Sequence, residues 1–262
     1  MSAGRPTPVT GDPAGGPRGW VHWFGVAVQF LTRIPVRVRF APGDLQRATG
    51  AFPAAGALVA AIGIGARWAL GPWLGAELAT IAALGAMVVA TGALHEDGLA
   101  DAADGLWGGR TPDERLRIMR DSRLGTYGTV ALITLFAVKF AALAPMSIAV
   151  FAATLVPAMV LARASSLILM RALPAAPESL ATLAGAPSVA GWVVAGASVA
   201  VSLVGFGVGA WLPLILALLV TAAAGGIALR KVGGINGDQL GAANQLVEVA
   251  VLVAGVGVFD VR

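Results

Sequence analysis

The segment GAFPAAGALVAAIGIGARWAL, residues 50–70, is followed after three residues by LGAELATIAALGAMVVATGAL, residues 74–94. Both runs are mostly Ala, Gly, Leu, Val and Ile, and each contains one charged residue, Arg67 or Glu77. An α-helix needs about 20 consecutive apolar residues to cross the hydrocarbon core of a bilayer. The two runs therefore predict two membrane-spanning helices joined by a short turn near Gly71.

Similar runs recur along the chain. Further spans are predicted at 129–144, 147–170, 189–211, 213–229 and 246–259, and because two of these are short, about six or seven spans are expected. Residues 20–32, WVHWFGVAVQFLT, are apolar but too short to cross. Their tryptophans favour a helix that lies in the membrane interface or re-enters it. The predicted fold class is an all-α, polytopic transmembrane bundle.

The composition limits the chemistry. Of the 262 residues, 57% are hydrophobic, 12% are charged and none is cysteine. Thiolate metal ligands, disulfides and a cysteine nucleophile are therefore excluded. Basic residues in a membrane protein usually set its topology, so the net charge of +4 does not predict a nucleic-acid partner. Residues 1–19, rich in Pro and Gly, are predicted to be a disordered tail, and 20–262 a single integral-membrane domain.

Charge is confined to alternate loops. The loops near positions 71, 145 and 212 are short and almost uncharged, whereas those at 33–49, 95–128, 171–188 and 230–245 hold almost every charge. Strict alternation places the four charged loops on one side of the membrane, and their arginines make that side the cytoplasm. We therefore expect the functional site to face the cytoplasm.

The loop HEDGLADAADGLWGG, residues 95–109, has the densest group of acids. Asp97, Asp101 and Asp104 are spaced i, i+4, i+7, so a helix presents them on one stripe. A divalent cation would offset their repulsion, and Mg²⁺ binds carboxylate oxygens while leaving positions for substrate phosphates. The alternative is a solvated face paired with arginines 110–123. We favour the metal, because ionisable groups at a membrane boundary are usually functional.

The neighbours of this stripe have two interpretations each. His95 either takes a proton from an attacking hydroxyl or caps the end of a span. Glu96 points about 100° away from Asp97, so it either adds a metal ligand or pairs with an arginine. Four glycines of this segment are expected to let a bulky ligand approach the backbone and to end the helix: Gly98, Gly105, Gly108 and Gly109.

Basic residues follow in the same loop. Thr111 and Pro112 mark a helix N-terminus, and Arg120 and Arg123 lie downstream. A guanidinium fork matches phosphate, so both arginines are predicted to bind substrate phosphates. A helix lying on anionic lipid explains the first arginines of this helix equally well, but not Asp121, which sits between two arginines beside a glycine-containing turn.

Other candidates come from separate segments. Arg163, in the middle of a predicted span, is expected to face an internal polar cavity. Residues 231–249 bring Asp238 and Glu248 to the cytoplasmic face, where their glycine-rich turn either binds an anion or caps the last span. Arg33 and Asp238 are additional candidates for substrate binding.

Four segments together closely resemble the cobalamin synthase family of adenosylcobinamide-GDP ribazoletransferases. They are FLTRIPV (30–36), HEDGLADAADGLWGG (95–109), IMRDSRLGTYG (118–128) and GGINGDQLGAANQLVE (233–248), and the order and spacing agree from about residue 22 to the end. One departure is Glu96, where family members usually have an apolar residue.

The resemblance implies an enzyme of the bacterial inner membrane that joins adenosylcobinamide-GDP to α-ribazole or its 5′-phosphate and releases GMP, with Mg²⁺ as cofactor. Its partners would be these small molecules and the lipid bilayer, and a homo-oligomer is one of the states considered. The residues alone also fit other Mg²⁺-dependent membrane transferases, such as CDP-alcohol phosphotransferases or prenyltransferases, and a cation-coupled transporter. Transporters, however, usually place such groups at the membrane midplane.

Overall fold

The computed structural model describes residues 19–39, 41, 43–176 and 185–261, so the predicted tail lies outside the described residues apart from Gly19. These ranges are helical and contain no β-strand, although an isolated bridge joins Ala175 to Ile235. The all-α class is confirmed.

The helices follow one another with short connections. In chain order they are α1 (Trp20–Leu31), α2 (Asp44–Ala48), α3 (Phe52–Thr91), α4 (Leu94–Gly108), α5 (Pro112–Met119), α6 (Thr126–Leu143), α7 (Ile148–Ala172), α9 (Val189–Ser202), α10 (Trp211–Val232) and α11 (Gly237–Val258), with short 3₁₀ helices η1 (Thr49–Ala51) and η2 (Leu203–Ala210). Thr111 caps α5 as predicted, because its Oγ1 accepts a hydrogen bond from the N–H of Glu114 at 3.2 Å.

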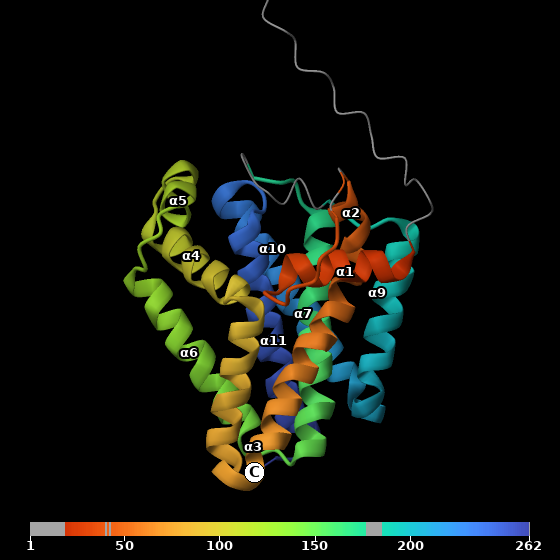
Figure 1. The fold of residues 1–262 in the computed structure, drawn as a ribbon. Coiled ribbons are helices and arrows are strands. Elements are labelled where there is room, and N and C mark those ends of the chain that lie inside the picture. The colour runs from red at the N-terminus through yellow and green to blue at the C-terminus, as the bar shows by residue number, and fades with distance from the viewer. Residues whose placement is uncertain (1–18, 40, 42, 177–184, 262) are drawn as a thin grey trace, which may run out of the picture.

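Two helical runs are long enough to cross a membrane twice. Five runs in the described chain are long and apolar enough to span, and two of them, Asp44–Thr91 and Val189–Val232, have 48 and 44 residues. Each is broken at a glycine with positive φ, Gly75 at 75° and Gly207 at 52°. In α3 the chain folds back on itself (Figure 1). Met87 of the second half therefore packs directly on Gly63 of the first half. Dividing both runs gives seven segments, which agrees with the predicted six or seven spans.

The turns differ in position from the prediction. They were expected near Gly71 and position 212, but the breaks lie at Gly75 and Gly207. Glycine adopts positive φ without steric cost, and this decides where the helix can reverse. Pro72 is accommodated inside α3.

The charged segments gather at one end of the bundle. Helix α1 lies across this end, as predicted for residues 20–32, and α2, α4 and α5 are at the same end (Figure 1). The side chain of Lys231, at the end of α10, donates to the carbonyl oxygen of Leu106 at 2.7 Å, and Arg115 donates to that of Lys231 at 2.9 Å. These bonds join α4, α5 and α10 at this end.

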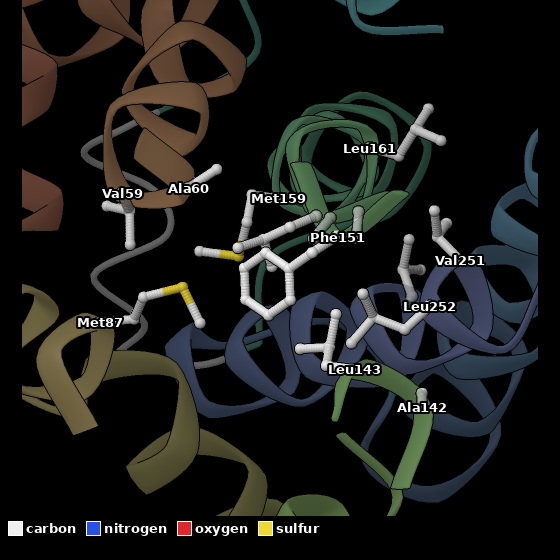
Figure 2. Close-up of a cluster of buried hydrophobic side chains, with 14 of the residues drawn as sticks. Val59, Ala60, Met87, Ala142, Leu143, Phe151, Met159, Leu161, Val251 and Leu252 are labelled. Atoms are coloured by element: carbon white, nitrogen blue, oxygen red, sulfur yellow. The ribbon is translucent and has the colours of Figure 1, made fainter. Parts of the chain in front are cut away.

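Away from the charged end, an apolar core holds α3, α6, α7 and α11 together. Phe151 and Leu143 are fully buried in it, and Met87 and Leu252 belong to the same cluster (Figure 2). This core fixes α11 in the middle of the bundle, and α11 also packs extensively against α4.

Candidate active site

Helices α4 and α11 cross with their backbones in close contact. A Cβ atom added at Gly98 would lie 3.1 Å from the Cα of Asp238, and one added at Gly241 would lie 3.2 Å from the Cα of Gly98. The expectation that Gly98 leaves room for a ligand is wrong, because α11 occupies that space. The crossing instead places the acids of α4 beside the first turn of α11.

Three carboxylates lie near this crossing. Asp97 is exposed on α4, Asp101 is half-buried one turn later, and Asp238 lies in the first turn of α11. Burial, together with the charges of Asp97, Asp238 and Asp104 in that order, raises the pKa of Asp101 to about 6. Like charges nearby penalise the ionised form. The three carboxylates therefore repel one another, and a bound cation would relieve this repulsion.

Asp104 has a different environment from the other acids of the stripe. It is buried, and its two carboxylate oxygens accept hydrogen bonds from the N–H groups of Gly125 at 2.7 Å and Gly128 at 2.9 Å. These groups belong to the start of α6, where unpaired N–H groups and the helix dipole favour a carboxylate. Asp104 therefore joins α4 to α6, and its helix neighbours Asp97 and Asp101 are better placed to meet a ligand.

Charged side chains are also paired inside the bundle. Lys139 of α6 and Arg163 of α7 are 2% exposed, and Glu248 of α11 is 1% exposed. Nζ of Lys139 lies 2.6 Å from Oε1 of Glu248, and Nη1 of Arg163 lies 3.8 Å from Oε2 of Glu248. The expectation that Glu248 reaches the cytoplasmic face is wrong, because α11 begins at Gly237 and carries Glu248 about three turns into the bundle.

Glu96 faces this buried network. Its Oε1 accepts a hydrogen bond from Nε2 of Gln245 at 3.2 Å, and Gln245 in turn accepts one from Lys139 at 2.6 Å. Glu96, Lys139, Arg163 and Glu248 line a cavity of about 10 Å³. Of its two predicted roles, pairing with basic residues is the one that this position favours.

His95 is buried in the first turn of α4. Burial, and then the positive charges of Arg163 and Lys139, lower the pKa of His95 well below its ordinary value, so the ring is neutral at pH 7. Its side chain does not cap α4, which begins after Ala93 without a side-chain cap. A neutral imidazole can accept a proton, but the same burial and positive charges make His95 a weak base.

A cavity of about 310 Å³ lies beside the crossing. Its polar lining comes from α4, α7 and α11, and its apolar lining comes from these helices together with α1 and α3. Arg163 lines both this cavity and the small one beside Glu96 and Glu248, and the small, charged one confirms the prediction that Arg163 faces an internal polar cavity. The polar lining residues include His95, Asp97, Arg163, Asp238 and Asn244.

The arginines predicted to bind phosphate are exposed around the charged end. Arg123 forms a two-point ion pair with Asp121, with Nη2 to Oδ2 at 2.6 Å and Nε to Oδ1 at 3.0 Å. This pairing lowers the pKa of Asp121 to about 2. Arg33 packs against Gly92 at the turn between α3 and α4, and Arg120 ends α5.

Sequence reasoning missed the partnership of Lys139, Gln245 and Glu248. The signal was present, because charges of opposite sign occur inside predicted spans far apart in the sequence. Such charges are costly in lipid unless they meet. The place of Asn244 in the cavity depends on how α11 packs.

Fold and site together define a multi-pass helical membrane protein with a polar cavity and a carboxylate group at its charged end. The model of the cobalamin-5-phosphate synthase family matches residues 23–256. This chain belongs to that family.

Relatives agree with this assignment. The chain is 42% identical over 240 residues to the adenosylcobinamide-GDP ribazoletransferase of Bradyrhizobium diazoefficiens, covering 87% of this chain and 90% of the relative. It is 38% identical over 247 residues to that of Rhizobium etli, covering 87% and 94%. It is 41% identical over 256 residues to that of Sinorhizobium medicae, covering 88% and 95%. No solved structure matches the chain.

Proposed function

We propose that this protein transfers the cobinamide phosphate of adenosylcobinamide-GDP to α-ribazole or its 5′-phosphate. A sugar hydroxyl of the acceptor attacks the phosphorus attached to cobinamide, a new P–O bond forms, the bond to the second phosphate breaks, and GMP leaves. The proton of the hydroxyl passes to the protein. The observation that carries this proposal is the family match over 23–256, which includes the carboxylates of the α4–α11 crossing.

The carboxylates fit a magnesium site completed by substrate. In the described ranges, no three His, Cys, Asp or Glu side chains converge closely enough to form a complete metal site. Mg²⁺ commonly takes only one or two carboxylates and fills its other positions with water and substrate phosphates. Asp97 and Asp101, with Asp238 beside them, would hold the ion. The raised pKa of Asp101 indicates burial and an excess of negative charge at this position. When bound, Mg²⁺ would neutralise charge on the diphosphate.

The protein's own side chains bind and orient the substrates. Arg120 and Arg33 are proposed to contact phosphate oxygens. Arg123 is proposed to do the same while Asp121 holds its guanidinium in place. His95 or Asp97, which line the same cavity, accepts the proton of the attacking hydroxyl. Asp104 is proposed to act through α6, whose first turn it holds, and Glu96 to stabilise the buried cations.

We further propose that the charged end faces the cytoplasm from the bacterial inner membrane. The support is the clustering of arginine-rich segments at this end, since such segments are retained on the cytoplasmic side. Residues 20–262 are proposed to act as one transferase domain, supported by the contacts of α11 with α4, α6, α7 and α10. We also propose that a lipid bilayer surrounds this domain, either as a monomer or as a homo-oligomer.

The test is GMP release by the purified protein in nanodiscs, supplied with adenosylcobinamide-GDP, α-ribazole and Mg²⁺. Stoichiometric GMP and adenosylcobalamin are expected, and chelation of the metal should stop both. Absence of GMP from protein that is folded and monodisperse would refute the proposed reaction. GMP release that survives chelation would refute only the magnesium requirement.

A further inference from the structure

The cavity beside the crossing has polar atoms that the protein leaves unpartnered. His95, Arg163 and Asn244 line it, with exposed fractions of 7%, 2% and 1%. Nδ1 of His95, Nε of Arg163 and Oδ1 of Asn244 are buried and have no hydrogen-bond partner among the described residues. Unpartnered buried polar atoms are rare in folded proteins. The three residues therefore give one wall of the cavity a polar character that hydrogen bonds within the protein do not fully satisfy.

The rest of the cavity is apolar and partly aromatic. Phe30 of α1 and Phe52 of α3 both line it, and their rings are stacked with centroids 5.8 Å apart and an interplanar angle of 11°. The other apolar lining residues are Leu31, Leu94, Met170 and Leu240. A lining that is apolar on one part and hydrogen-bonding on another suits a flat aromatic group attached to a hydroxylated one.

Size and charge select between the two substrates. A volume of about 310 Å³ is close to that of a small drug-sized ligand and far too small for a corrinoid ring with its side chains. Its ionised lining consists of one cation, Arg163, which is shared with Glu248, and two anions, Asp97 and Asp238. A neutral ligand is therefore favoured over a phosphate inside the cavity.

We propose that this cavity binds the nucleoside acceptor, with its flat base against Phe30, Phe52 and Leu240 and its sugar against the polar side. This inference rests on the proposed function, which supplies the two substrates. His95, Arg163 and Asn244 contact the bound nucleoside, and its hydroxyl reaches the edge where Asp97 and Asp238 lie. Asn244 and Leu240 determine acceptor specificity without taking part in the chemistry.

The experiment measures the binding of α-ribazole to the purified protein by calorimetry, with no adenosylcobinamide-GDP present. Leu240→Trp fills the cavity, and Leu246→Trp is the matched control, because Leu246 is on the same helix but lines a separate groove. Asn244→Leu removes the polar group. Since Nδ2 of Asn244 also donates to the carbonyl oxygen of Ala162 at 2.9 Å, Ser166→Leu on α7 serves as a second cavity variant if Asn244→Leu does not fold.

We expect α-ribazole affinity to fall by at least roughly tenfold in each cavity variant and to stay unchanged in the control. In turnover, the KM for α-ribazole should rise while the KM for adenosylcobinamide-GDP stays the same. Normal α-ribazole binding by folded cavity variants would overturn the inference, even if the wild-type protein releases GMP. The wild-type protein could instead bind α-ribazole without releasing GMP, while the cavity variants fail to bind it. That result would refute the proposed reaction and support the inference about the cavity.

Discussion

Nζ of Lys139 lies 2.6 Å from Oε1 of Glu248, and both side chains are buried between membrane-spanning helices. The pair joins α6 to α11, the helix that carries Asp238 and Asn244. A buried charge in such a setting needs a partner of opposite sign, because the desolvation cost of an unpaired charge is high. The pair therefore supports the helix on which the cavity and the carboxylate group depend.

Removing one member of this pair should be more damaging than removing both. Lys139→Met or Glu248→Gln leaves a buried charge, and each is expected to cost about 3–5 kcal/mol of stability. The double variant should recover a large part of that loss. Thermal unfolding of the four proteins in the same detergent measures the coupling. Losses that simply add up would show that the two charges do not stabilise each other.

Asp101→Asn should abolish most turnover while leaving the fold intact. Loss of a carboxylate that holds a cation against developing phosphate charge is expected to lower kcat by roughly 10²–10³-fold. Asp113→Asn is the matched control, because Asp113 is exposed in the first turn of α5. Equal activity of the two variants at limiting Mg²⁺ would remove Asp101 from the proposed site.

Asp104→Asn should give the opposite pattern. Asparagine offers one acceptor oxygen in place of the two that receive the N–H groups of Gly125 and Gly128. We expect a stability loss of about 1–3 kcal/mol with little change in Mg²⁺ affinity, since a buried N–H group is left unpaired. Thermal unfolding and Mg²⁺ titration on the same sample separate these effects. A lost Mg²⁺ affinity at unchanged stability would restore Asp104 as a metal ligand.

The metal should compete with a proton at Asp101. In the metal-free protein its pKa is raised to about 6 from 3.8, so the folded protein holds this proton more tightly than the unfolded chain does. Ionisation of Asp101 therefore lowers the stability of the metal-free fold as pH rises between these values, and bound Mg²⁺ should reverse that trend. Mg²⁺ affinity measured at pH 5, 6 and 7 should increase through pH 6. Asp101→Asn should weaken this dependence, and Asp238, whose pKa burial also raises to about 6, should keep part of it. An unchanged affinity across that range would contradict the assignment.

Gly98→Ala should disturb the site by separating the two helices. Its Cβ would lie 3.1 Å from backbone atoms of Asp238, so α4 and α11 must move apart by a few tenths of an ångström. Small misplacements of reacting groups can cost up to about 10²-fold in rate. Gly108→Ala is the control, because its Cβ would meet only Cδ1 of Ile118 at 3.7 Å. Comparable kcat values for both variants would show that close contact at the crossing is not required.

The sequence predicted the spans and the acidic helix because both depend on local patterns. Runs of apolar residues define α3, α6, α7 and α10 to within a few residues. The span predicted at 189–211 covers α9 together with η2, and α11 begins well before the predicted span at 246. The spacing of Asp97 and Asp101 was sufficient to place both on α4. The turns at Gly75 and Gly207 were displaced, because several glycines compete for a positive φ and only packing decides among them.

The partners within the site could not be predicted from local patterns. Contact between Gly98 and Gly241 is a property of how α4 packs on α11, and it alone brings Asp238 to Asp101. In the sequence Asp104 belongs to the same acidic pattern as Asp97 and Asp101. In the structure both of its carboxylate oxygens accept hydrogen bonds from backbone N–H groups at the start of α6. Glu96 and Glu248 turn inward for the same kind of reason, since Lys139 and Arg163 come from other helices.

The central claim is that the carboxylates at the α4–α11 crossing hold a divalent cation together with the substrate diphosphate. Electron paramagnetic resonance of Mn²⁺, added in place of Mg²⁺ to the purified protein with adenosylcobinamide-GDP, tests this claim directly. We predict a bound Mn²⁺ signal coupled to phosphorus that is lost in Asp97→Asn and Asp101→Asn and retained in Asp113→Asn. A phosphorus-coupled signal of full strength in all three variants would contradict the account.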